Sequence, residues 1–144
     1  MGYELFRDRE KLASKFTAGD FFGAGPAGVE EHSFDFVHAA AFFHLFSWHE
    51  QVEAMSKAVR LLKPKSGSML FGRQTGLDEA GVVKHPATRS GEMYRHNADS
   101  LRKIIAEVSE KTGIELKGTV SVDDRHGEKK GQNWRVLNFC LTIL

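Results

Sequence analysis

The sequence predicts an α/β protein with a mostly parallel sheet that ends in an antiparallel hairpin. Three observations carry this prediction. The stretch from Phe34 to Gly76 has the pattern strand, turn, helix, loop, strand. A second capped helix follows near Asn97, and the chain finishes with two strand-like runs around a polar segment. Alternating strands and helices are typical of parallel sheets, which bind ligands at the carboxyl ends of their strands.

The composition is that of one globular domain covering residues 1–144. Hydrophobic residues make up 41% and charged residues 27% of the chain, and the formal net charge is +1. Such a charge gives no reason to expect a nucleic-acid or membrane partner, and no run approaches the ~18 apolar residues of a membrane span. The amino-terminal residues do not resemble a signal peptide. The single cysteine, Cys140, fits a reducing compartment, so we expect a cytoplasmic protein.

The first third of the chain predicts a helix, a short strand and a loop. Apolar residues spaced for one helical face run from Tyr3 to Lys15, and Phe16 to Phe22 reads as a strand that ends at Asp20. The segment Gly23 to Ser33 is rich in turn residues and is expected to be a loop. It contains GAGPAG, which imitates a glycine-rich ligand loop. A ligand-binding loop of that kind leads into a helix, whereas GAGPAG leads into VEEHS, and the strand before it is not the one that carries such a loop. We therefore interpret the segment as a plain connection.

The best-defined element is a helix that begins at Trp48. It follows a short apolar strand, Phe34 to Ala39, which we expect to be buried. Ser47 and Glu50 have the spacing of a capping box, and the helix must end before Pro64. Its apolar residues recur at three- and four-residue steps: Trp48, Val52, Met55, Val59 and Leu62. Ser68 to Gly72 is then predicted to be a short strand.

The following segment, Thr75 to Arg95, has weak periodicity and is predicted to be a long loop. Asn97 can cap a second helix, Ala98 to Thr112, and Gly113 suits the position after its end. Long loops inside compact domains are often functional.

Two strands close the predicted fold. Ile114 to Val122 and Trp134 to Leu144 are strand-like and flank a polar, glycine-containing segment. The simplest pairing of two such neighbours is an antiparallel hairpin.

Histidines are the first candidates for chemistry. Three of the seven, His38, His44 and His49, lie in the turn between the first strong strand and its helix. With no nearby cysteine and no HExxH pattern, we expect no metal site. A neutral imidazole could act as a general base near a substrate hydroxyl. Alternatively, His44 packs among its phenylalanine neighbours while hydrogen-bonded.

Aromatic residues in the same turn have two open interpretations. They could line a pocket for an apolar polycyclic substrate, or they could form core where the turn folds back; these are Phe42, Phe43, Phe46 and Trp48. The segment Tyr94 to His96 precedes the second helix, where a pocket wall would lie, but surface is the favoured interpretation.

Four segments resemble a known family. They are GYELFRDR at residues 2–9, FDFVHAAAFFHLFSW at 34–48, LLKPKSGSMLFGRQTG at 61–76 and MYRHNADSLRKIIAEVSEKTG at 93–113. In order and spacing they resemble fungal class I S-adenosylmethionine-dependent methyltransferases of secondary-metabolite pathways, notably polyketide and meroterpenoid ones. The terminal hairpin is also distinctive of that family. The resemblance implies a partial Rossmann-like methyltransferase sheet.

The resemblance implies roles for particular residues. Asp20, with Phe21, would meet the adenine end of S-adenosylmethionine, and Ala39, Ala40 and Ala41 would border its methionine end. An apolar small-molecule substrate would contact a further set: Phe43, Trp48, Arg73, Gln74 and Tyr94. His44 or His96 would assist the transfer as a catalytic base. Asp20, Arg73 and Gln74 could instead be ordinary strand-end or surface residues.

The family's first strand and glycine-rich loop have no counterpart in this sequence, and its second strand would precede Met1. We therefore expect the strand from Phe34 to Ala39, normally central, to be an open edge that pairs with another strand, for example in a homodimer. The chain would be a methyltransferase or part of one. The alternative is a non-methylating relative that binds or isomerises a small molecule, or that partners a complete enzyme.

Overall fold

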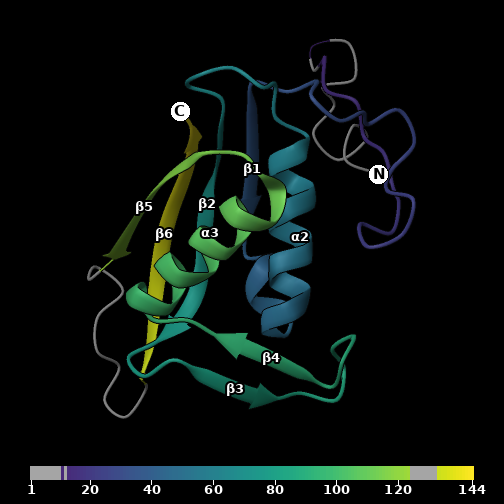
Figure 1. Cartoon of the computed structure of the whole chain (residues 1–144). Coiled ribbons are helices and arrows are strands. Elements are labelled where there is room, and N and C mark those ends of the chain that lie inside the picture. Colours follow the sequence, from purple (N-terminus) through teal and green to yellow (C-terminus); the bar gives the residue numbers. More distant parts are fainter. Residues whose placement is uncertain (1–10, 12, 124–132) are drawn as a thin grey trace.

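The computed structural model describes residue 11, residues 13–123 and residues 133–144. Figure 1 shows the arrangement of its elements. In chain order they are β1 (Phe36–Ala40), the 3-10 helix η1 (Phe43–Leu45), α2 (Trp48–Arg60), β2 (Met69–Leu77), β3 (Gly81–Lys84), β4 (Glu92–Arg95), α3 (Ala98–Thr112), β5 (Leu116–Asp123) and β6 (Trp134–Ile143).

Four strands form one mixed sheet in the order β1-β2-β6-β5. The α/β class and the terminal hairpin are confirmed. β1 and β2 are parallel, with Phe36 opposite Met69, whereas β6 is antiparallel to both β2 and β5. Because β6 lies beside β2, the described sheet has one parallel and two antiparallel pairings and is not mostly parallel. β3 and β4 make a separate antiparallel pair.

Helices α2 and α3 cover one face of this sheet (Figure 1). The core lies between them and the sheet, and its largest fully buried apolar residues are Phe43, Met55, Leu62, Leu70, Leu101, Ile104, Leu137 and Leu141. The opposite face has an apolar, exposed region, where Phe36 is 61% exposed and Phe71 is 37% exposed. The expectation that β1 is buried is therefore wrong for one of its faces, while its position at the sheet edge is as predicted.

Both helices begin and end where the sequence predicts. The Glu50 carboxylate accepts the Ser47 backbone N–H at 2.9 Å and completes the capping box of α2. The Asn97 side chain accepts the Ser100 N–H at 2.9 Å, and Gly113 adopts φ 69° directly after α3. A left-handed residue suits glycine, which has no Cβ to clash with the chain.

The predictions before β1 are only partly met. The predicted helix from Tyr3 lies largely outside the described residues, and residues 13–15 are not helical. The predicted strand at residues 16–22 is wrong, because its end is a turn. The Asp20 carbonyl accepts the N–H groups of Gly23 and Gly25, both at 3.1 Å, and the Asp20 carboxylate accepts the Phe22 N–H at 3.0 Å. Aspartate favours such turns over a strand. Residues 23–33 form the predicted loop.

Two predictions in the middle of the chain are also wrong. β2 continues beyond Gly72 to Leu77, because each residue of this extension pairs with β6. The predicted long loop contains the β3–β4 hairpin, in which Val82 lies opposite Tyr94. The first difference results from pairing with residues distant in sequence, and the second from pairing across a turn between neighbouring segments. Within the described residues, no helix combines the length and apolar character needed to cross a bilayer.

Gly72 is required where β1 and β2 meet. A Cβ at this position would overlap the Ala39 carbonyl and would lie 3.0 Å from Cζ of Phe139. Gly72→Ala should therefore lower the free energy of unfolding by about 1–3 kcal/mol, the usual cost of overpacking, as measured by urea denaturation. Gly81→Ala is the matched control, since its Cβ would meet nothing within 4 Å. Equal stability of the two variants would contradict this account of the strand contact.

Candidate functional site

An aromatic hollow lies beside the first turns of α2. Its volume is about 380 Å³, and it is lined by Gly19, Asp20, Phe21, Phe22, Phe42, Phe46 and Arg89. The rings pack edge to face, with centroids 5.5 Å apart for Phe21 and Phe42 and 4.8 Å apart for Phe22 and Phe46. Apolar walls with a few charged groups are typical of small-molecule sites.

Asp20 is the acidic group of the aromatic hollow. Its turn is held against α2 because the Lys57 ammonium donates to the Phe22 carbonyl at 2.7 Å. The carboxylate is exposed and accepts one backbone N–H, so it retains capacity for a ligand donor. The structure thus brings Asp20 and Phe21, both predicted from the resemblance, into one concave site.

The predicted residues Ala39, Ala40 and Ala41 lie at the carboxyl end of β1 and lead directly into Phe42 of the hollow. Ala41 has φ 53°, a left-handed conformation that is uncommon for alanine. Its N–H donates to the Arg73 carbonyl at 2.8 Å, which holds the turn against β2. A strained turn at a strand end is a common setting for a functional site.

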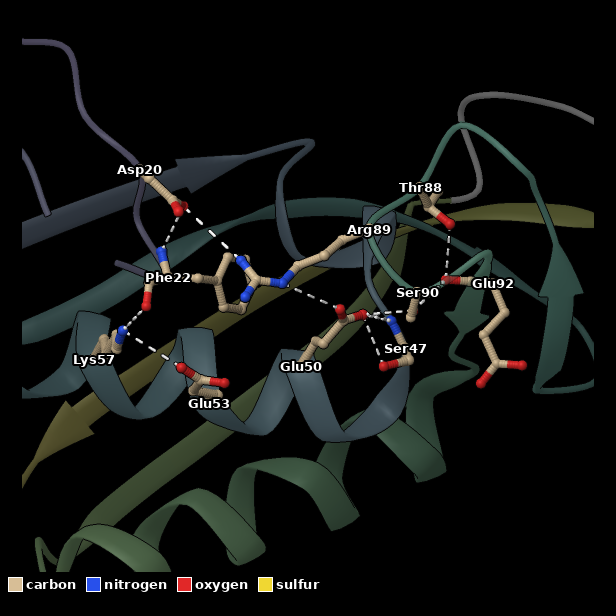
Figure 2. Close-up of polar contacts among 10 residues, drawn as sticks. All are labelled: Asp20, Phe22, Ser47, Glu50, Glu53, Lys57, Thr88, Arg89, Ser90 and Glu92. Atoms are coloured by element: carbon tan, nitrogen blue, oxygen red, sulfur yellow. Dashed lines mark hydrogen bonds and ion pairs between the residues drawn. The ribbon is translucent and has the colours of Figure 1, made fainter. Parts of the chain in front are cut away.

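Arg89 closes one side of the hollow (Figure 2). Its guanidinium lies 4.6 Å from the centroid of the Phe22 ring, and its nitrogens are 4.0 Å from an Asp20 oxygen and 3.7 Å from a Glu50 oxygen. The neighbouring Ser90 hydroxyl donates to Glu50 at 2.8 Å. The turn between β3 and β4 is thereby joined to the amino end of α2.

A second polar group lies on the helix-covered side of the sheet. His44 accepts the Thr75 N–H through Nδ1 at 3.4 Å, so the proton of its neutral ring is on Nε2. Gln74 is 2% exposed, and neither of its amide atoms has a partner among the described residues. Arg95 approaches His44 closely enough to affect its charge, and its buried Nη1 is also without a partner there. Burial lowers the pKa of Arg95.

Three predicted residues form a ring cluster of their own. The centroids of Trp48, Tyr94 and His96 are 4.9–5.2 Å apart. His96 is 0% exposed, and its Nδ1 lies 2.9 Å from the Ser100 hydroxyl. These surroundings are those of a packed core histidine, and the catalytic roles of His96 and His44 stay predictions.

The other three predicted substrate residues are not among those that line the aromatic hollow. Phe43 is in the core against Phe139, with ring centroids 5.9 Å apart. Arg73 and Gln74 are consecutive in β2, so their side chains point to opposite faces of the sheet, and Arg73 is exposed on the face without helices. Both residues lie within β2 and not beyond the end of a strand, and only Gln74 can reach the helix side.

Sequence reasoning missed Arg89 as a site residue and considered Arg95 only as part of a pocket wall or surface, without a role of its own. Their hairpin does have a sequence signal, since the β-branched Val82 and Val83 and the aromatic Tyr94 flank a segment with Pro86 and Gly91. No signal indicated that Arg89 would reach Asp20, because that contact joins distant segments. Within the described residues, no cluster of histidine, cysteine and carboxylate groups could hold a metal ion.

Comparisons with known proteins identify relatives. No protein-family model matches the chain. It is 43% identical over 122 residues to O-methyltransferase phiE of Fungal sp. (strain ATCC 74256), an alignment that covers 83% of this chain and 40% of the relative. It is 30% identical over 138 residues to O-methyltransferase atr3 of Stereocaulon alpinum, which covers 94% of this chain and 39% of that protein. The chain thus spans about two fifths of the length of these curated relatives.

Solved structures share the fold. A SAM-dependent methyltransferase from Methanosarcina mazei has a TM-score of 0.59 and 14% identity, covering 90% of this chain and 68% of its own. The [4+2]-cyclase SpnF has a TM-score of 0.64 and 16% identity, covering 97% and 61%. A Haemonchus contortus N-methyltransferase crystallised with S-adenosylhomocysteine has a TM-score of 0.50 and 15% identity, covering 79% and 34%.

The two buried histidines make stability depend on pH. Burial lowers the pKa of His44 from 6.5 to about 4, with a further contribution from Arg95, and burial alone lowers the pKa of His96 to about 4. The unfolded chain therefore binds more protons than the folded chain between these values. Stability should be retained above pH 6.5 and fall as the pH drops toward 4, by up to roughly 3 kcal/mol for each histidine. Urea denaturation at several pH values measures this loss.

The variants His44→Gln and His96→Gln are the controls. Each should flatten the stability profile between pH 4 and 6.5 by about half, because each removes one of the two titrating groups. Two results would show that these rings are not buried as described. One is a wild-type stability profile that is flat across this interval, and the other is NMR signals of His44 and His96 that titrate near pH 6.5.

Proposed function

We propose that this chain, a member of the fungal secondary-metabolite methyltransferase family, uses its aromatic hollow to bind the adenine end of S-adenosylmethionine. The observation that carries this proposal is the position of Asp20 at the mouth of a hollow with phenylalanine walls. An adenine ring presents flat apolar faces and an exocyclic amine. Phenylalanine rings can stack on the faces, and a carboxylate can accept the amine.

The cofactor would supply an electrophilic methyl group, and the chain would position the acceptor. Ala41, which directly follows β1, connects the two parts: the chain runs from it into Phe42 of the hollow, and its N–H donates to the carbonyl of Arg73, the neighbour of Gln74. Unpartnered buried donors at Gln74 and Arg95 favour a substrate oxygen that carries negative charge. His44 would donate through Nε2 and orient that oxygen. Alignment of this kind is the main requirement of methyl transfer.

Calorimetric titration tests the proposal. Wild-type protein should release or absorb heat with S-adenosylhomocysteine, and Asp20→Asn should weaken binding roughly tenfold because a hydrogen bond to a charged acceptor becomes a neutral one. Asp99→Asn is the matched control, since Asp99 is exposed, pairs with Arg102 in α3 and does not line the hollow as the described residues form it. Absence of binding at millimolar ligand, or equal affinity in both variants, would contradict the assignment of the hollow.

A non-methylating function is the second candidate. The [4+2]-cyclase SpnF has this fold, and the buried donors around Gln74 could act on a carbonyl without any methyl transfer. Mass spectrometry of an incubated substrate separates the two, because only methylation adds the mass of one methylene. We also propose a cytoplasmic location, which the single unpaired cysteine supports.

We further propose that β1 pairs with the β1 of a second copy. β1 is an end strand of the described sheet. In its parallel register with β2, Asp35 accepts from Met69 and Ala41 donates to Arg73, so the backbone groups of Phe36, His38 and Ala40 point to the open side. A twofold axis at His38 would place each Phe36 opposite the partner's small Ala40, and exposed apolar edges of this kind favour pairing.

Light scattering tests this pairing. We expect wild-type protein to be dimeric and Phe36→Lys to be monomeric, because a charge on the edge opposes strand addition. Val82→Lys is the control, since Val82 is a similarly exposed strand residue, at 58% against 61% for Phe36. A cooperatively melting wild-type monomer at all concentrations would show that the edge remains unpaired.

A further inference from the structure

We propose that Arg89 is a displaceable gate of the aromatic hollow, and that it selects for ligands able to take Asp20 and the Phe22 ring from its guanidinium. The inference rests on the proposed adenine-binding role of the hollow. Arg89 belongs to the turn between β3 and β4, which no predicted role includes. Its side chain contacts both ligand-binding features of the hollow, the carboxylate and an aromatic face.

The turn that carries Arg89 is well ordered by its own hydrogen bonds. The His85 N–H donates to the Gly91 carbonyl at 2.9 Å, and the Thr88 hydroxyl donates to the His85 carbonyl at 2.8 Å. Gly91 has φ 81°, which closes the turn. The turn therefore presents Arg89 as a unit, and Figure 2 shows the side chain extending from it toward Asp20.

The contacts of Arg89 are suited to release. Its nitrogens lie 4.0 Å from Asp20 and 3.7 Å from Glu50, longer than the 2.7–2.9 Å of a charge-assisted hydrogen bond. The side chain is 53% exposed, and exposed ion pairs contribute little to stability. A guanidinium over a ring is also a modest interaction at an exposed site. A planar ligand with an amine can replace both contacts with a stacked ring and a hydrogen bond.

The turn itself would remain attached when Arg89 moves. Ser90 donates to Glu50 at 2.8 Å, and Glu50 also accepts both groups of Ser47. Glu50 thus holds the turn through Ser90 while Arg89 exchanges its partners. The gate is consequently one side chain on a fixed support, and its occupied and displaced states differ mainly at Asp20 and Phe22.

Adenosine titration of the full chain tests the gate. Because the free protein must give up the Arg89 contacts, Arg89→Ala should bind adenosine roughly three- to tenfold more tightly than wild type. Raising the salt concentration should reduce this difference, since screening weakens the ion pairs. Arg102→Ala is the matched control: it removes an exposed ion pair of α3 with Asp99 and should leave the affinity unchanged.

The outcomes separate the gate from the proposed function. Unchanged or weaker adenosine binding in Arg89→Ala, with clear wild-type binding, would overturn the gate and leave the hollow assignment intact. If neither protein binds adenosine, the hollow assignment fails. Hydrogen exchange then decides whether Arg89 holds Asp20 and Phe22 in the free protein. In ligand-free protein, faster exchange of the Phe22 and Gly23 amides in Arg89→Ala, but not in Arg102→Ala, would support the gate, because Arg89 contacts Asp20 and the Phe22 ring. Equal exchange of these amides in both variants would overturn it.

Discussion

The Glu50 carboxylate is the group on which the arrangement of the site depends. It accepts the Ser47 N–H at 2.9 Å and the Ser47 hydroxyl at 2.8 Å, which starts α2, and it accepts the Ser90 hydroxyl at 2.8 Å. Burial opposes its charge, but these hydrogen bonds and the nearby Arg89 lower the pKa of Glu50 below its ordinary value. One ionised group therefore sets both the start of a helix and the position of a hairpin 40 residues away.

Gln51 extends this anchoring to the other side of the helix. Its amide donates to the carbonyls of Phe46, at 3.0 Å, and Tyr94, at 2.8 Å, and the Tyr94 N–H also donates to Phe46. Two consecutive residues of α2 thus hold the β3–β4 hairpin at both ends of β4. The aromatic hollow, through Arg89, and the polar group, through Arg95, therefore share this support.

Short-range signals explain which parts could be predicted from sequence. The caps at Ser47 and Asn97 act within three residues, and both helices were predicted correctly. The extension of β2 depends on pairing such as Gln74 with Leu137, which no local pattern encodes. The resemblance supplied Asp20 and Phe21, but Arg89 depends on three segments meeting in space. The predicted strand ended at Gly72, before Gln74, whose burial results from alternation within the longer β2.

The hollow and the open edge of β1 make different demands on a partner. Ligands of α/β sheets bind where adjacent parallel strands end, and Ala41 ends β1 beside the hollow. A strand added in parallel would place its own carboxyl end there and could add a wall to the site. A twofold copy pairs antiparallel and brings an amino end instead. Dimerisation through β1 should therefore leave ligand affinity unchanged, whereas a parallel partner strand would raise it.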